Sequence, residues 1–154
     1  MNIQPHEIIG ALAALGVYPP RRVVIKRAVL SNDITGLSAG SALTPITWDT
    51  GDFDPLEPTR IYVPPGFSHA LIAGQARVDG TGAASIRIRQ NGNGTFAIGY
   101  NYGTTASPAS ISACAQMWPV SGGDYFELLV NRFTSLTDIL SDSSATSFSL
   151  TLFP

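Results

Sequence analysis

The sequence predicts an all-β protein, an antiparallel sandwich or jelly roll, with one short helix at its N-terminus. Three observations predict this class. The 154 residues include 15 glycines and 11 prolines, a composition typical of short strands joined by turns. Apolar and polar residues alternate in several segments, as in strands that bury one face. Such segments recur about every ten residues, the spacing of sandwiches and jelly rolls.

Residues 5–15 carry the only helical pattern. Pro5 suits a first helical turn, and Glu7 favours the positive end of the helix dipole. Ile8, Leu12 and Leu15 recur at helical spacing and form an apolar face. A helix this short is marginal alone in water, so we expect it to dock on a partner.

A basic segment follows, with an expected strand over residues 21–30 and a polar linker over residues 31–41. We therefore expect an N-terminal arm of residues 1–41 and a β domain of residues 42–154. The basic side chains of the arm are Arg21, Arg22, Lys26 and Arg27. They fit either docking on an acidic surface or a solvated strand face, and both interpretations stay open.

The β domain is expected to contain strands near residues 60–63, 68–78, 84–90, 95–103, 110–117, 125–133 and 147–153. Asn91-Gly92 predicts a hairpin turn, because both residues tolerate positive φ. In the segment that follows this turn, alternation places Phe96, Ile98, Tyr100 and Tyr102 on one face. The other face is small and flat and suits close approach of another layer or subunit.

Composition excludes several classes of protein. Charged residues make up only 13% of the chain and the net charge is −2, so we expect no nucleic-acid partner. No apolar stretch reaches the roughly 18 residues of a membrane helix, and we expect no membrane insertion. The apolar segment Ile8–Val17 has the wrong charge polarity for a signal peptide, so synthesis in a cytoplasm is expected.

No catalytic centre is predicted. Cys114 is the only cysteine, which excludes an internal disulfide, and we expect it to be a buried structural thiol. His6 and His69 lie in different regions, without the spacing of a metal site or a nucleophile motif. A carbohydrate hydrolase would need a pair of carboxylates in a cleft, and Asp124 and Glu127 are near in sequence, but Asp124 reads as a turn residue. We therefore expect a protein without enzymatic activity and without a cofactor.

An acidic cluster spans residues 49–57 and consists of Asp49, Asp52, Asp54 and Glu57. Oxygen ligands from such loops suit Ca²⁺, but the spacing lacks the pattern of an EF-hand. We expect solvated carboxylates that cap turns, and ion binding stays the alternative.

Five segments then resemble a known family. In order they read TPITWDTGDFDP, RIYVPPGFSHALIAGQARV, IRIRQNGNG, PVSGGDYFELLVNRF and FSLTLF. Together they cover about residues 44–154 and resemble the C1q/TNF-like jelly rolls of tailed-phage structural proteins. The N-terminal 40 residues have no counterpart in this resemblance, and the fold does not fix the role.

The resemblance implies a homotrimer whose copies cover each other's sheet faces, with Phe96, Ile98, Tyr100 and Tyr102 in the core or at the trimer axis. It implies a virion structural protein, a capsid decoration, cement or head-fibre protein of a tailed phage or phage-like particle. Its arm would attach it to the major capsid protein or to tail or baseplate proteins of the same particle. We expect it on the virion surface after synthesis in the host cytoplasm.

A second role from a different class also stays open. The same fold could form the receptor-binding tip of a tail fibre or baseplate that recognises a host surface glycan. The exposed loops near Asn91–Thr95, Thr104–Ser110 and Asp138–Ser144 would then carry the function. Trp118, which precedes Pro119 at a strand end, is the best aromatic candidate for stacking on a sugar ring.

Overall fold

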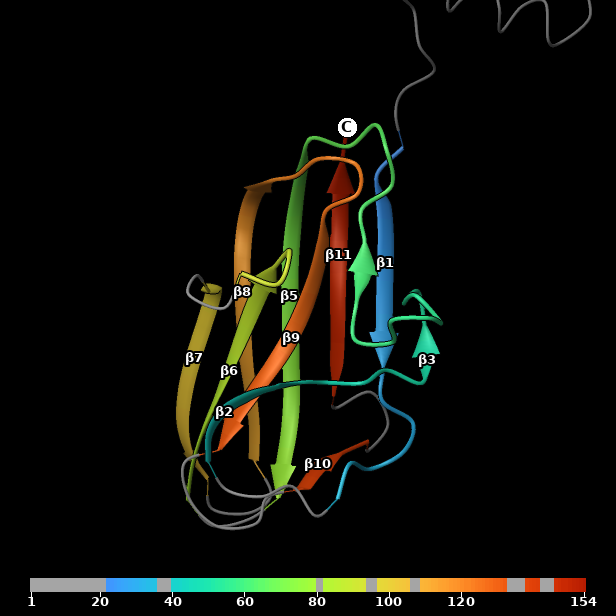
Figure 1. Cartoon of the computed structure of the whole chain (residues 1–154). Coiled ribbons are helices and arrows are strands. Elements are labelled where there is room, and N and C mark those ends of the chain that lie inside the picture. The colour runs from blue at the N-terminus through green and yellow to red at the C-terminus, as the bar shows by residue number, and fades with distance from the viewer. Residues whose placement is uncertain are drawn as a thin grey trace, which may run out of the picture.

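A computed structural model describes residues 22–35, 40–79, 82–93, 97–105, 109–132, 138–141 and 146–154. This part of the chain forms two antiparallel sheets, one behind the other in Figure 1, and contains no helix. It therefore holds no helix long and apolar enough to cross a membrane. The helix expected over residues 5–15, with Ile8, Leu12 and Leu15, lies outside the described residues, as does Arg21.

The first sheet is built mainly from the ends and the middle of the chain. Its strands are β1 (Val24–Val29), β3 (Thr50–Gly51), β5 (His69–Asp79), β8 (Ala109–Pro119), β10 (Asp138–Leu140) and β11 (Ser147–Phe153). They run in the order β10-β5-β11-β1-β3, and β8 pairs with β5. The last strand of the described chain thus lies between the first strand and β5.

The second sheet contains β2 (Gly40–Pro45), β4 (Ile61–Tyr62), β6 (Gly82–Gln90), β7 (Ala97–Thr105) and β9 (Tyr125–Arg132). The order is β2-β9-β6-β7, with β4 paired to β9. After β6, Asn91 and Gly92 have φ of 50° and 69°, and β7 pairs with β6. The N–H of Asn93 bonds the carbonyl of Gln90 over 3.0 Å, so the predicted turn with positive φ at Asn91 and Gly92 is confirmed.

The core lies between the two sheets. β11 alternates strictly, with Phe148, Leu150 and Leu152 fully buried. Trp48 stacks on Phe148, with ring centroids 6.2 Å apart and an interplanar angle of 13°. At Gly74 of β5 the two layers approach so closely that a Cβ would lie 2.5 Å from Cδ1 of Leu128 in the opposite sheet. Tight interdigitation of this kind fixes the spacing of the layers.

The basic strand expected in the arm belongs to the jelly roll. β1 pairs with β11 along its whole length, from Val24 opposite Leu152 to Val29 opposite Ser147. It also pairs with β3. A boundary near residue 42 therefore does not separate this strand from the sandwich, because its backbone hydrogen bonds are made with the last strand.

The aromatic face of the strand after the hairpin is described only by its backbone. The register pairs Tyr100 with Arg87 and Tyr102 with Ser85 on β6. Phe96 and the side chains of Ile98, Tyr100 and Tyr102 lie outside the described residues. Their role in the core or at a trimer axis therefore stays a prediction.

Candidate functional site

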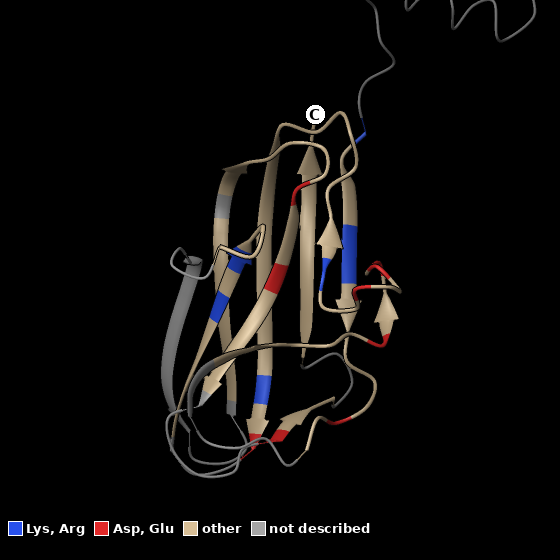
Figure 2. Cartoon of the chain, in the orientation of Figure 1, with Lys and Arg blue, Asp and Glu red and all other residues tan. Residues whose placement is uncertain are grey.

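The side of the first sheet that faces away from the core carries several exposed large apolar side chains. We call it the outer face. Its central part consists of Ile25 and Arg27 of β1, Leu71, Ala73 and Gln75 of β5, Ser112, Cys114 and Met117 of β8, and Ser147, Ser149, Thr151 and Phe153 of β11. β11 crosses its middle without a charged residue, as Figure 2 shows. Arg27 is the only charged side chain of this set, and Arg77 and Asp79 follow on the same side of β5 toward its end.

One end of the outer face is apolar. The strand register places Ile25, Thr151 and Leu71 in one row across β1, β11 and β5. Ile25 is 67% exposed and Leu71 is 39% exposed. Met117, 58% exposed, follows beside Leu71 on β8. Large apolar side chains gathered in one exposed row mark an interaction surface, whereas single ones do not.

A β-bulge in β8 presents Met117. The register between β5 and β8 shifts between Ala70 and Ile72, and Met117 has a φ of 47°. This left-handed conformation is disfavoured for a residue with a side chain and costs about 1–2 kcal/mol. The fold thus retains a strained backbone at the position that adds an apolar side chain to the face.

The middle of the outer face is a shallow hollow of about 530 Å³. Its floor is made of small residues such as Ala73, Ser112 and Ser149, with Arg27 at one side. Cys114 also lines it and is exposed. The prediction of a buried thiol was therefore wrong for the single chain, because alternation in β8 buries Ala113 and Ala115 and turns Cys114 outward.

The basic residues of the arm do not share one surface. Arg27 lies on the outer face, while the neighbouring Lys26 is half buried and opposes the buried Leu150 in the register. Arg22 is exposed before β1 begins. Successive side chains of a strand point to opposite faces, so a docking surface formed by all four basic residues does not follow from this geometry. Their role in particle docking stays a prediction.

Trp118 is partly buried and packs against the core. Its indole Nε1 donates a hydrogen bond to Oε1 of Gln90 over 2.8 Å. The polar edge of the ring is thus occupied by the protein, which agrees with a packing role. Sugar stacking by Trp118 stays a prediction.

Asp124 and Glu127, the carboxylate pair considered for hydrolysis, both accept hydrogen bonds within the fold. Glu127 is only 3% exposed. Its carboxylate accepts hydrogen bonds from Nε of Arg89 over 2.8 Å and from Oγ1 of Thr59 over 3.0 Å. Asp124 accepts from the backbone N–H of Ser121, as expected for a turn residue. Both carboxylates are thus held by hydrogen bonds to neighbouring groups of the fold.

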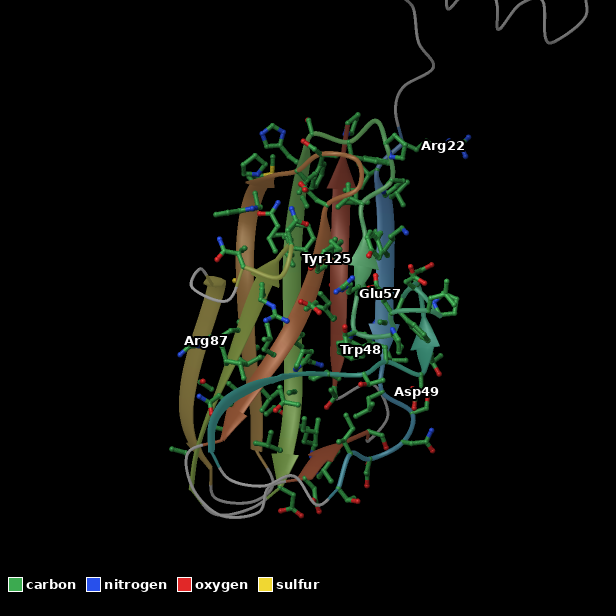
Figure 3. The ribbon with its side chains drawn as sticks, in the orientation of Figure 1. Arg22, Trp48, Asp49, Glu57, Arg87 and Tyr125 are labelled. Atoms are coloured by element: carbon green, nitrogen blue, oxygen red, sulfur yellow. The ribbon has the colours of Figure 1, made fainter. Side chains whose placement is uncertain are left out.

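Arg60 and Tyr125 extend this polar network on the second sheet, and sequence reasoning missed it. The Arg60 guanidinium lies 4.2 Å from the ring centroid of Tyr125 and pairs with Glu57. Tyr125 and Glu57 are labelled in Figure 3. Tyr62 donates to Oε2 of Glu57 over 2.5 Å, and this hydrogen bond raises the pKa of Tyr62. The alternating Arg87 and Arg89 were the only sequence signal, because the acceptors come from distant segments.

The acidic cluster caps turns. Asp49 accepts hydrogen bonds from the backbone N–H groups of Ser31 and Asn32 over 2.7 Å and 3.0 Å. Burial alone would raise the pKa of Asp49, but these hydrogen bonds outweigh it and lower the pKa. Asp54 accepts from the backbone N–H of Leu56 over 2.8 Å. Among the described residues no group of three His, Cys, Asp or Glu side chains could hold a metal ion.

Comparison with solved structures identifies the architecture. Eiger TNF from S. frugiperda superposes with a TM-score of 0.64 at 12% identity, over 87% of this chain and 94% of that one. Murine APRIL at pH 5.0 gives 0.59 at 14% identity, and at pH 8.5 it gives 0.56 at 13%. Both APRIL matches cover 86% of this chain and all of theirs. The fold is TNF-like.

The expectation of a TNF/C1q-like jelly roll is therefore confirmed for the described part of the chain. No family model matches the sequence. No curated protein matches it either. At 12–14% identity the TNF-like fold is shared, but the role of the chain is not thereby assigned.

Proposed function

We propose that this chain is a non-enzymatic structural protein that works as a homotrimer, assembled through the outer face. The observation that carries the proposal is the exposed apolar row of Ile25, Leu71 and Met117 on a face whose middle is lined by small residues and one charged residue, Arg27. Closed homo-oligomers are the common way in which such a surface is covered.

The energetics favour association through this face. Fully burying one large aliphatic side chain contributes about 1.5–3 kcal/mol. Three of them in each copy, with a flat floor that lets backbones approach, would supply the apolar centre that stable interfaces have. Charged residues are depleted at such centres, and Arg27 is the one charged residue that lines the central hollow.

We further propose that the trimer is displayed on the surface of a virion, as a capsid decoration or head-fibre protein. The motifs of residues 44–154 that resemble tailed-phage jelly rolls support this role. Residues 1–21, with the apolar positions Ile8, Leu12 and Leu15, would attach it to the major capsid protein or to tail or baseplate proteins. Attachment of three arms at once would raise the avidity for the particle.

Native mass spectrometry of the whole chain tests the proposal. The expected mass is three times 16.2 kDa. Leu71→Arg should shift it to the monomer, because three new charges would be buried at the interface. Leu56→Arg is the matched control, since Leu56 is 90% exposed in the 51–57 loop and should leave the trimer intact. A wild-type monomer, or a trimer in Leu71→Arg, would overturn the proposal.

A second candidate function is recognition of a host surface glycan. The observation that favours it is an aromatic-walled hollow beside β1, between Phe53 and Tyr62. It lies apart from Trp118, the residue that the sequence indicated.

A further inference from the structure

A second hollow, of about 530 Å³, opens at the edge of the sandwich beside β1. It lies between Lys26 on β1, the segment that follows β3, and Tyr62 on β4. The segment after β3 contributes Asp52, Phe53, Asp54 and Pro55. Its volume is in the range of small-molecule sites, which is about 300–1,000 Å³.

The segment after β3 is held in place by its backbone. Asp52 donates its N–H to the carbonyl of Arg27 over 2.8 Å and accepts the N–H of Arg27 on Oδ2 over 3.0 Å. The N–H of Asp54 bonds the carbonyl of Arg60 over 3.1 Å. The hollow is therefore preformed, and little conformational entropy would be lost on ordering it when a ligand binds.

Two aromatic rings wall the hollow in fixed orientations. Phe53 is partly buried against the core. Tyr62 packs on Tyr125 with ring centroids 5.4 Å apart, and its hydroxyl is tied to Glu57. Rings held in this way offer apolar faces without further loss of side-chain freedom.

The polar groups of the hollow keep unused capacity. The Lys26 ammonium makes no hydrogen bond or ion pair with the described residues, and it is a half-buried group with three donors. Asp52 uses Oδ2 and Asp54 uses Oδ1 for backbone N–H groups. The second oxygen of each carboxylate has no partner among the described residues and remains an acceptor.

The mixture of groups decides the class of ligand. A metal ion is disfavoured because the lysine ammonium lines the same hollow, and an anion is disfavoured by the two carboxylates. A saccharide presents neighbouring hydroxyls that donate and accept at once, and an apolar face of C–H groups. It can therefore donate to Asp52 and Asp54, accept from Lys26 and stack on Tyr62 or Phe53.

We propose that this hollow binds one neutral saccharide unit of a larger glycan. The site rests on the second candidate function and does not depend on the trimer. The sequence indicated Trp118 as the ring that stacks on a sugar. In this hollow the stacking ring is Tyr62 or Phe53, while Trp118 packs against the core.

NMR titration of the ¹⁵N-labelled full chain tests the site. The probes are lactose, maltose, N-acetylglucosamine and methyl α-mannoside, each added up to about 50 mM because a single sugar unit binds weakly. At least one probe should shift the amides of residues 51–54 and 62. The absence of shifts there with all four probes, or shifts confined to the surroundings of Trp118, would overturn the proposal.

Matched variants assign the contacts. Lys26→Met and Asp54→Asn should each weaken binding of that probe about tenfold, because each removes one charge-assisted hydrogen bond. Both should melt like the wild type, since Lys26 has no side-chain partner among the described residues and Asn keeps the acceptor for the Leu56 N–H. Trp118→Phe is the control and should bind normally. Unchanged affinity in both hollow variants would contradict the proposal, whatever the oligomeric state.

Discussion

The spacing of the two sheets makes a sharp prediction for Gly74. A Cβ at this position would lie 2.5 Å from Cδ1 and 3.0 Å from Cδ2 of Leu128, and 3.1 Å from Cδ2 of Phe148. All three atoms belong to buried side chains of the core. Adding a methyl group to so tight a core costs about 1–3 kcal/mol. The lower entropy of an unfolded chain with alanine offsets about 0.4–1 kcal/mol of this.

Gly74→Ala should therefore lower the free energy of unfolding by about 1–2 kcal/mol. Urea unfolding at one fixed protein concentration measures it, because self-association would otherwise change the apparent stability. Leu128→Val removes both Cδ atoms, so the double variant should lose about 1 kcal/mol less than the sum of the single changes. Strictly additive losses, or a stable Gly74→Ala protein, would refute the close approach of the sheets.

Two further predictions concern the polar network and the outer face. Glu127→Ala should lower the free energy of unfolding by about 2–3 kcal/mol, less than a fully buried pair because Arg89 and Arg60 are partly exposed. In Glu127→Gln, which keeps an acceptor for Thr59, the loss should be smaller; equal losses in urea unfolding would contradict the role of this hydrogen bond. Cys114 should react slowly with a thiol reagent in the wild type and rapidly in Leu71→Arg, and equal rates would place the thiol outside the interface.

Local patterns in the sequence were enough to predict most of the strands. The predicted strand over residues 147–153 coincides with β11, because Phe148, Leu150 and Leu152 alternate with hydroxyl side chains. β2 was assigned partly to a linker, since GSALTP has no alternation and its pairing with β9 shifts register. That pairing depends on a distant strand, which a local pattern does not report.

The candidate sites were harder to predict, because they join segments far apart in the chain. The row of Ile25, Leu71 and Met117 forms only when β1, β5 and β8 meet in one sheet. The bulge at Met117 carries no glycine that would signal it. The four basic residues are close together in sequence, but the side chains of the neighbours Lys26 and Arg27 point to opposite faces of β1.

The two faces of β1 contribute to two different surfaces, and this leads to a last prediction. Ile25 and Arg27 belong to the outer face, whereas Lys26 lines the saccharide hollow on the other side of the strand. Assembly through the outer face should therefore leave each copy's affinity for a single sugar unit unchanged. On a surface densely coated with that sugar, a trimer should bind about 10²–10⁴-fold more tightly than the Leu71→Arg monomer, because three linked sites act together. Comparing NMR titration with surface binding of both proteins measures the two quantities. A monomer that has lost the single-unit affinity would show that neighbouring copies complete the hollow, and the two surfaces would then not be independent.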